Sequence, residues 1–234
     1  MATKVTRFLI GGGLAVAGLL AGGRFDMKVR NDFFAGFAGD NEALQRGMKA
    51  SEEALAANPK HAEALVWHGA GLFFEAGQFL QKHDMEKGQE YWTRGLKEMD
   101  DAGAMEPDSV SVLAPRGSTV LTASRFVPAE MAKPLIERGV ADFQHILDMQ
   151  TAYFDTLGTH PRGELLIFLA DGYSRLGQEE KARTLFTRAQ TDLAGTVYAK
   201  KAAVWLETKS LPASQAACSG CHTPASANKP ALVQ

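Results

Sequence analysis

The chain consists of long segments in which apolar residues recur every three or four positions, separated by short polar or glycine-containing connections. This spacing places one face of an α-helix against a core. Alternating runs of Val, Ile and Thr, which would indicate strands, are nearly absent. The pattern therefore predicts an all-α fold.

A second pattern, of large and small residues, recurs within the predicted helices. The first helix of a predicted pair has a large apolar residue, a small residue four positions on, and another apolar or aromatic residue. These positions are Leu65–Gly69–Leu72, Leu113–Gly117–Val120 and Leu166–Ala170–Tyr173. The second helix has small residues at similar spacing: Gly47–Ser51–Ala54, Gly95–Met99–Ala102 and Ala182–Phe186–Ala189. Small residues let paired helices approach closely.

This arrangement resembles the tetratricopeptide repeat (TPR), with the best match over residues 166–189. Pro59 and Pro107 follow two of the second helices, as the proline that ends a TPR unit does. Their separation exceeds the family's repeat of about 34 residues. We expect the extra length to lie in insertions at residues 80–89 and 125–134. The resemblance implies a solenoid of helical hairpins, and an unrelated helical bundle is the alternative.

Both ends of the sequence differ from this helical region. Lys4 and Arg7 precede an uncharged run from Phe8 to Gly23, which is typical of an export signal. The run is short for a membrane span of about 20 residues, so cleavage and retention as an anchor both remain open. The predicted organisation is a signal peptide or N-terminal membrane anchor (1–23), a linker (24–39), a TPR-like α-helical domain (40–208) and a C-terminal tail (209–234). The predicted location is the periplasm or another exported compartment, with residues 8–23 as a possible inner-membrane anchor.

The C-terminal tail is rich in Pro, Ala and Ser and contains the sequence Cys218-Ser219-Gly220-Cys221-His222. A tail of this composition buries too little apolar surface to fold alone. A C-x-x-C-H motif is the attachment site of a c-type haem. Its two thiols add to the haem vinyl groups, and the adjacent imidazole ligates the iron. The motif predicts one covalent haem c, with Cys218 and Cys221 as thioethers and His222 as an axial ligand.

Other uses of these cysteines fit less well. They are the only two in the chain, whereas a structural zinc site requires about four ligands. A thioredoxin-type pair needs a βαβ framework, which the helical pattern excludes. A disulfide between them would close a very small loop and stabilise little. Two unrelated cysteines remain the simplest alternative.

The second axial ligand of the haem is left open by the sequence. An ordinary class I cytochrome c has a downstream methionine ligand, but the twelve residues after His222 contain neither Met nor His. The ligand could come from the helical body or from another chain, or the position could be open. The groups available on the body include His61, His68, His83, His145, His160, Met99, Met105, Met131 and Met149. His160, beside Pro161 at a predicted turn, is a candidate, whereas Met99 and Met149 are predicted to be core and His61 and His68 to share a solvated helix face.

Charge and motifs limit the function further. The formal net charge of −2 gives no basic surface for nucleic acid. The sequence has no phosphate-binding loop, nucleophile elbow or catalytic acid–base pair, so no enzymatic activity is predicted. The predicted function is electron transfer by an exported monohaem c-type cytochrome, whose TPR-like surface docks on a protein partner in a membrane-bound redox complex. The alternative is a scaffold or assembly subunit in which the haem is structural or senses a gas.

Overall fold

A computed structural model describes residues 24–212, and this part of the chain is all-α, which confirms the predicted class. The elements are α1 (Phe25–Phe37), α2 (Asn41–Ala57), α3 (Ala62–Gln81), α4 (Met85–Met105), α5 (Val110–Ala123), α6 (Ala129–Gln150), the 3-10 helix η1 (Phe154–Thr156), α7 (Thr159–Arg175), α8 (Glu179–Asp192) and α9 (Val197–Thr208). The predicted leader at residues 1–23 and the predicted haem-attachment residues Cys218, Cys221 and His222 lie outside the described residues.

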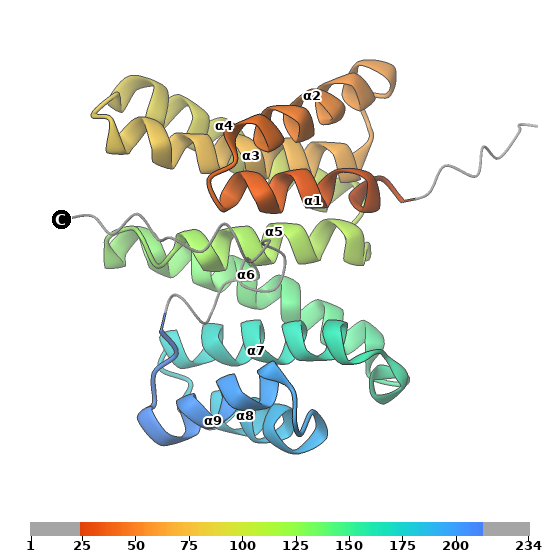
Figure 1. The fold of residues 1–234 in the computed structure, drawn as a ribbon, viewed down its shortest axis with the longest axis vertical. Coiled ribbons are helices and arrows are strands. Elements are labelled where there is room, and N and C mark those ends of the chain that lie inside the picture. The colour runs from red at the N-terminus through yellow and green to blue at the C-terminus, as the bar shows by residue number, and fades with distance from the viewer. Residues whose placement is uncertain (1–23, 213–234) are drawn as a thin grey trace, which may run out of the picture.

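Consecutive helices pack as antiparallel neighbours, and the odd-numbered helices also contact one another in order (Figure 1). Thus α1 contacts α3, α3 contacts α5, α5 contacts α7, and α7 contacts α9. The resulting stack runs from α1–α4 at the top of the view through α5–α6 to α7–α9.

The odd-numbered helices α3, α5 and α7 end at the same edge of the molecule, on the left of Figure 1. This C-terminal edge carries the turns at residues 82–84, 124–128 and 176–178 and the end of the described chain. Arg175 at the end of α7 donates to the carbonyl oxygens of Leu121 and Ser124, at 3.1 and 3.0 Å, which joins the ends of α5 and α7.

Helices α3 and α4 approach each other closely at two glycines of the small-residue pattern. A Cβ on Gly95 would lie 2.7 Å from the carbonyl oxygen of Gly69, and one on Gly69 would lie 2.8 Å from the carbonyl oxygen of Gly95. Real Cβ atoms do not approach backbone oxygens this closely, so both positions require glycine. The prediction that these residues mark a close helix pair is confirmed.

Two expectations about connections differ from the structure. Residues 24–39 are not a linker, because they contain α1, whose Phe25, Val29 and Phe33 recur every four positions and are buried. Phe33 stacks on Trp67 of α3 with ring centroids 5.1 Å apart. Residues 80–89 and 125–134 are not insertions between the paired helices either, because most of them belong to α3, α4 and α6. The helices themselves are longer, leaving turns of only 82–84 and 124–128.

Helix α9 closes the lower end of the stack and positions the end of the described chain. Trp205 is fully buried, stacks on Phe186 at 4.6 Å and donates its indole N–H to the Ser174 hydroxyl at 2.8 Å. Leu211, three positions after α9 ends, is also buried in this core. The first residues of the predicted C-terminal tail (209–234) are therefore held against the body at Leu211.

Candidate functional site

The residues of the helical body that could supply an axial ligand do not gather at one place. Within residues 24–212, no group of three or more His, Cys, Asp or Glu side chains could hold a metal ion. No such group marks out one candidate ligand in this part of the chain, so the contacts of each candidate are described in turn.

His160, the candidate singled out from the sequence, lies in the first turn of α7 and is engaged by neighbours. Its Nδ1 is 2.7 Å from the hydroxyl of the buried Tyr198, and its Nε2 is 3.4 Å from a carboxylate oxygen of Glu164. The side chain is 50% exposed. Both ring nitrogens thus have a polar partner within α7 and α9.

Three other histidines also have partners. The prediction of a solvated His68 is wrong: the ring is buried in α3, with Nδ1 2.5 Å from Oε2 of Glu98 and Nε2 3.7 Å from Glu52. His61 caps the start of α3, where its Nδ1 accepts a hydrogen bond from the backbone N–H of Ala64 at 3.4 Å. The Nε2 of His145 is 2.7 Å from Asp108.

The methionines divide between the core and the surface. Met99 is fully buried and Met149 packs at the edge of the core, in agreement with their predicted structural role. Met105 and Met131 are exposed. Trp67 and Phe73 are buried between helices, so these aromatic residues pack in the core.

His83 stands apart from the other candidates because of its backbone. It lies in the α3–α4 turn at a φ of 62°, the left-handed region. The N–H of the following residue, Asp84, bonds to the carbonyl oxygen of Phe79 at 3.0 Å, which is a Schellman turn. For a residue with a Cβ this conformation costs about 1 kcal/mol or more, whereas glycine adopts it freely.

The same turn occurs twice more within residues 24–212, each time with glycine. Gly39 after α1 and Gly177 after α7 have φ values of 110° and 75°. In each turn the next residue's N–H bonds to the carbonyl oxygen five positions back: Asp40 to Ala35 at 3.0 Å and Gln178 to Tyr173 at 2.9 Å. His83 thus stands where the other two Schellman turns have glycine, and Lys209, just after α9, is a second non-glycine residue in the left-handed region, at a φ of 58°. Sequence reasoning included His83 among the available groups but missed this feature, although a comparison of the helix ends could have found it.

The surroundings of His83 are open and partly apolar. Its side chain is exposed, and no hydrogen bond, ion pair or ring contact joins it to another residue in the described part of the chain. Met85, two positions on, is 64% exposed, and Phe126 of the α5–α6 turn on the same edge is 76% exposed. Lys82 and Lys87 are exposed beside this turn.

Arg125, in the α5–α6 turn, links this edge to the end of the described chain. Its Nη1 donates to the carbonyl oxygen of Leu211 at 3.1 Å, and its Nη2 donates to Oδ1 of Asp171 at 2.5 Å. Burial raises the pKa of Asp171, although the charges of Arg125 and Arg175 favour the ionised form. The segment that leads toward Cys218 therefore leaves the body beside the α5–α6 turn.

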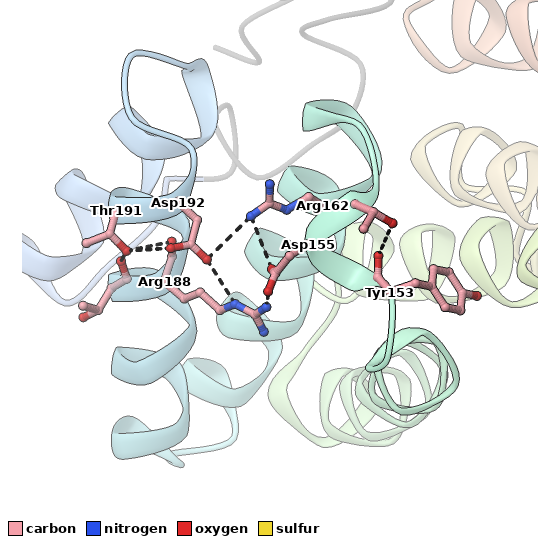
Figure 2. Close-up of polar contacts among 8 residues, drawn as sticks. Tyr153, Asp155, Arg162, Arg188, Thr191 and Asp192 are labelled. Atoms are coloured by element: carbon pink, nitrogen blue, oxygen red, sulfur yellow. Dashed lines mark hydrogen bonds and ion pairs between the residues drawn. The ribbon is translucent and has the colours of Figure 1, made fainter.

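A second polar cluster, at the N-terminal end of α7, contains two arginines and two aspartates that pair with one another. Figure 2 shows Asp155, Arg162, Arg188 and Asp192 pointing toward one another. The Nη2 of Arg188 is 2.7 Å from Asp155, and its Nε is 3.2 Å from Asp192. The guanidinium of Arg188 also lies over the ring of the buried Phe154, 4.6 Å from its centroid. These contacts tie η1, α7 and α8 together, so we assign the cluster a structural role.

None of the helices in the described range is both long enough and apolar enough to cross a membrane. Comparisons with protein families, with curated proteins and with solved structures find no match to this chain.

Proposed function

We propose that the protein is an exported monohaem c-type cytochrome that transfers single electrons. The observation that carries the proposal is the C-x-x-C-H sequence ending at His222. In this proposal Cys218 and Cys221 hold the haem as thioethers, and His222 ligates the iron. The haem supplies a one-electron redox centre, and the protein's part is to anchor and orient it.

The proposed organisation is a TPR-like helical solenoid with a short haem-bearing tail. Two features support it: the antiparallel pairs in which odd-numbered helices contact one another, and the small residues at the α3–α4 crossing. The fixed position of Leu211 also supports it, because this residue stands only seven positions before Cys218. A haem so close to an anchored residue stays near the body, where the helical surface can dock on a membrane-bound redox partner.

Production of the full chain in a host that attaches c-type haem outside the cytoplasm tests the proposal. We expect the intact mass to increase by one haem, and we expect the pyridine haemochrome spectrum to be that of a haem with two thioethers. The Cys218→Ser/Cys221→Ser variant is the matched control and should carry no covalent haem. A wild-type protein whose mass lacks haem under these conditions would contradict the proposal. Electron transfer itself is tested by reversible one-electron reduction and by exclusion of carbon monoxide, since tight carbon monoxide binding by the untreated protein would favour gas sensing.

A further inference from the structure

Arg30 of α1 is a half-buried arginine without a carboxylate partner in the described part of the chain. Every other arginine in residues 24–212 has a carboxylate oxygen at 3.9 Å or less. Arg30 has none there, and its Nε is buried without a hydrogen-bond partner. The Nε of Arg162 is also unpartnered, but the Nη2 of Arg162 lies 3.5 Å from Asp155. A buried N–H of a cation is costly unless an acceptor meets it.

Trp67 of α3 is a second buried donor without an acceptor among the described residues. Only 4% of the residue is exposed, and its Nε1 has no hydrogen-bond partner. Its ring stacks on Phe33 and meets Phe34 edge-on, with centroids 5.1 and 5.8 Å apart. An aromatic face is at most a weak acceptor for an indole N–H, whereas a buried indole N–H usually has a polar partner. The buried Trp205 follows that rule, because it donates to the hydroxyl of Ser174 at 2.8 Å.

The contacts between α1 and α3 place these two donors at the same part of the helix pair. Near the start of α1, the backbone N–H of Asp26 donates to Oε2 of Glu63 at 3.1 Å. Further along α1, Phe34 contacts Trp67. Arg30 lies midway between Asp26 and Phe34 at four-residue spacing, and therefore on the same face of α1. This face packs against the stretch of α3 from Glu63 to Trp67, which is only about 6 Å long.

The two carboxylates near Arg30 are engaged elsewhere. Asp26 accepts two hydrogen bonds from Arg24, at 3.0 and 2.9 Å, and Glu63 accepts the backbone N–H of Asp26. Within the described residues neither of them pairs with Arg30. The face between α1 and α3 thus presents a cationic donor and a neutral donor, and its own acidic side chains satisfy neither.

We propose that Arg30 and Trp67 form a binding site for a carboxylate group. The carboxylate accepts hydrogen bonds from the guanidinium of Arg30, whose planar fork matches its two oxygens, and from the indole N–H of Trp67. The rings of Phe33 and Phe34 favour a singly charged carboxylate over a phosphate dianion, because burial removes more hydration energy from the dianion. This site goes beyond the proposed function. Its carboxylate has two possible sources, a small organic acid in solution or a propionate of the proposed haem, and the experiment separates them.

The test follows the indole N–H signals of the full chain by ¹H–¹⁵N nuclear magnetic resonance during titration with sodium acetate. Sodium chloride at the same ionic strength is the reference. The chain has three tryptophans, so three signals are expected, and Trp67→Phe identifies the signal of Trp67. The first titration uses the haem-free Cys218→Ser/Cys221→Ser variant. The Trp67 signal should move downfield and saturate, because its N–H gains a charged acceptor, and the other two signals should not move.

Substitutions of Arg30 then show whether the guanidinium binds the acetate. In the haem-free chain Arg30→Gln should weaken acetate binding about tenfold or more, since a charge-assisted hydrogen bond is lost. Arg46→Gln is the matched control, because Arg46 is an arginine of α2 that pairs with Asp32 of α1, and acetate binding should be unchanged. Circular dichroism checks that both variants keep the helical fold. A Trp67 signal that ignores acetate, or that responds equally in Arg30→Gln, overturns the inference and shows that water satisfies these donors.

The haem-loaded wild type separates the two sources of the carboxylate. A Trp67 signal that moves with acetate in the haem-free variant but not in the haem-loaded protein identifies a haem propionate as the occupant. A signal that moves in both proteins identifies a carboxylate from solution. Because the site itself is measured without haem, a wild type that carries no covalent haem overturns the proposed function and leaves the carboxylate site to be judged on the haem-free titration.

Discussion

The Nη1 atom of Arg125 donates a hydrogen bond of 3.1 Å to the carbonyl oxygen of Leu211, 86 positions further along the chain. The other terminal nitrogen of the same guanidinium bonds to the buried carboxylate of Asp171 at 2.5 Å. One side chain thus joins the α5–α6 turn, helix α7 and the segment after α9. These two hydrogen bonds of Arg125, called the Arg125 joint below, fix the position at which the chain leaves the helical body.

Replacement of Arg125 by Met should destabilise the fold strongly. The change leaves the Asp171 carboxylate buried without its closest cation, a situation that costs about 3–5 kcal/mol. Urea denaturation followed by circular dichroism measures the loss. Arg46→Met is the matched control, because the exposed Arg46–Asp32 pair should contribute only about 0–1 kcal/mol. Equal effects of the two substitutions would argue against a structural role of the Arg125 joint.

The stability contributed by Asp171 should decrease as pH rises. Burial raises the pKa of Asp171 above the ordinary value of 3.8, with Arg125 and Arg175 opposing the shift. The folded state therefore binds this proton more tightly than the unfolded state does, and the advantage is lost as pH rises through the folded pKa. The unfolding free energy of the wild type, measured relative to Asp171→Asn, should therefore fall as the pH rises above about 4. A relative stability that rises over this range would contradict the assigned direction.

The α3–α4 crossing should not tolerate a single methyl group. In Gly95→Ala the new Cβ meets the carbonyl oxygen of Gly69 and the backbone of Phe73. Overpacking of this kind costs about 1–3 kcal/mol. Gly77→Ala, in α3 but with open space around its Cβ, should instead stabilise the fold by about 0.5–1 kcal/mol through helix propensity. Thermal unfolding of the two variants should shift in opposite directions, and a similar shift for both would exclude close packing as the reason for Gly95.

The buried His68–Glu98 pair should give a pH dependence of the opposite sign to that of Asp171. Burial opposes ionisation of Glu98, yet His68 and Arg94 together lower its pKa below 4.5. The stability that ionised Glu98 gains from His68 and Arg94 is fully present above pH 4.5. It is lost as the pH falls through the pKa of Glu98 in the folded protein.

Replacement of His68 by Gln should therefore cost about 1.5–3 kcal/mol at pH 7 and progressively less in acid. Urea denaturation at pH 7 and pH 3 measures the difference between variant and wild type. His145→Gln, which removes an exposed partner of Asp108, is the control and should have little effect at either pH. A cost for His68→Gln that does not change with pH would show that packing alone holds the ring.

The sequence predicts the helices and one crossing well because both depend on local spacing. Gly69 and Gly95 could be found by their period, since close helix approach requires small residues at fixed intervals. Helix α1 was missed because charged residues separate its apolar positions, and its burial depends on packing against α2 and α3, which includes the stacking of Phe33 on Trp67. His83 could be named but not distinguished, because a positive φ depends on how α3 ends and α4 begins.

The way in which the helices contact one another also bears on how the chain folds. In the described residues the substantial helix contacts join each helix to the next or to the next but one. Such contacts close short loops and involve little entropy loss before they form. Folding should therefore be rapid and begin within adjacent helix pairs, independently of the distant ends of the chain. The segment after α9 can join the body only after α5 and α7 have met, because Arg125 and Asp171 come from these two regions. The C-terminal segment would then be the last to become ordered, when the surface that receives it already exists.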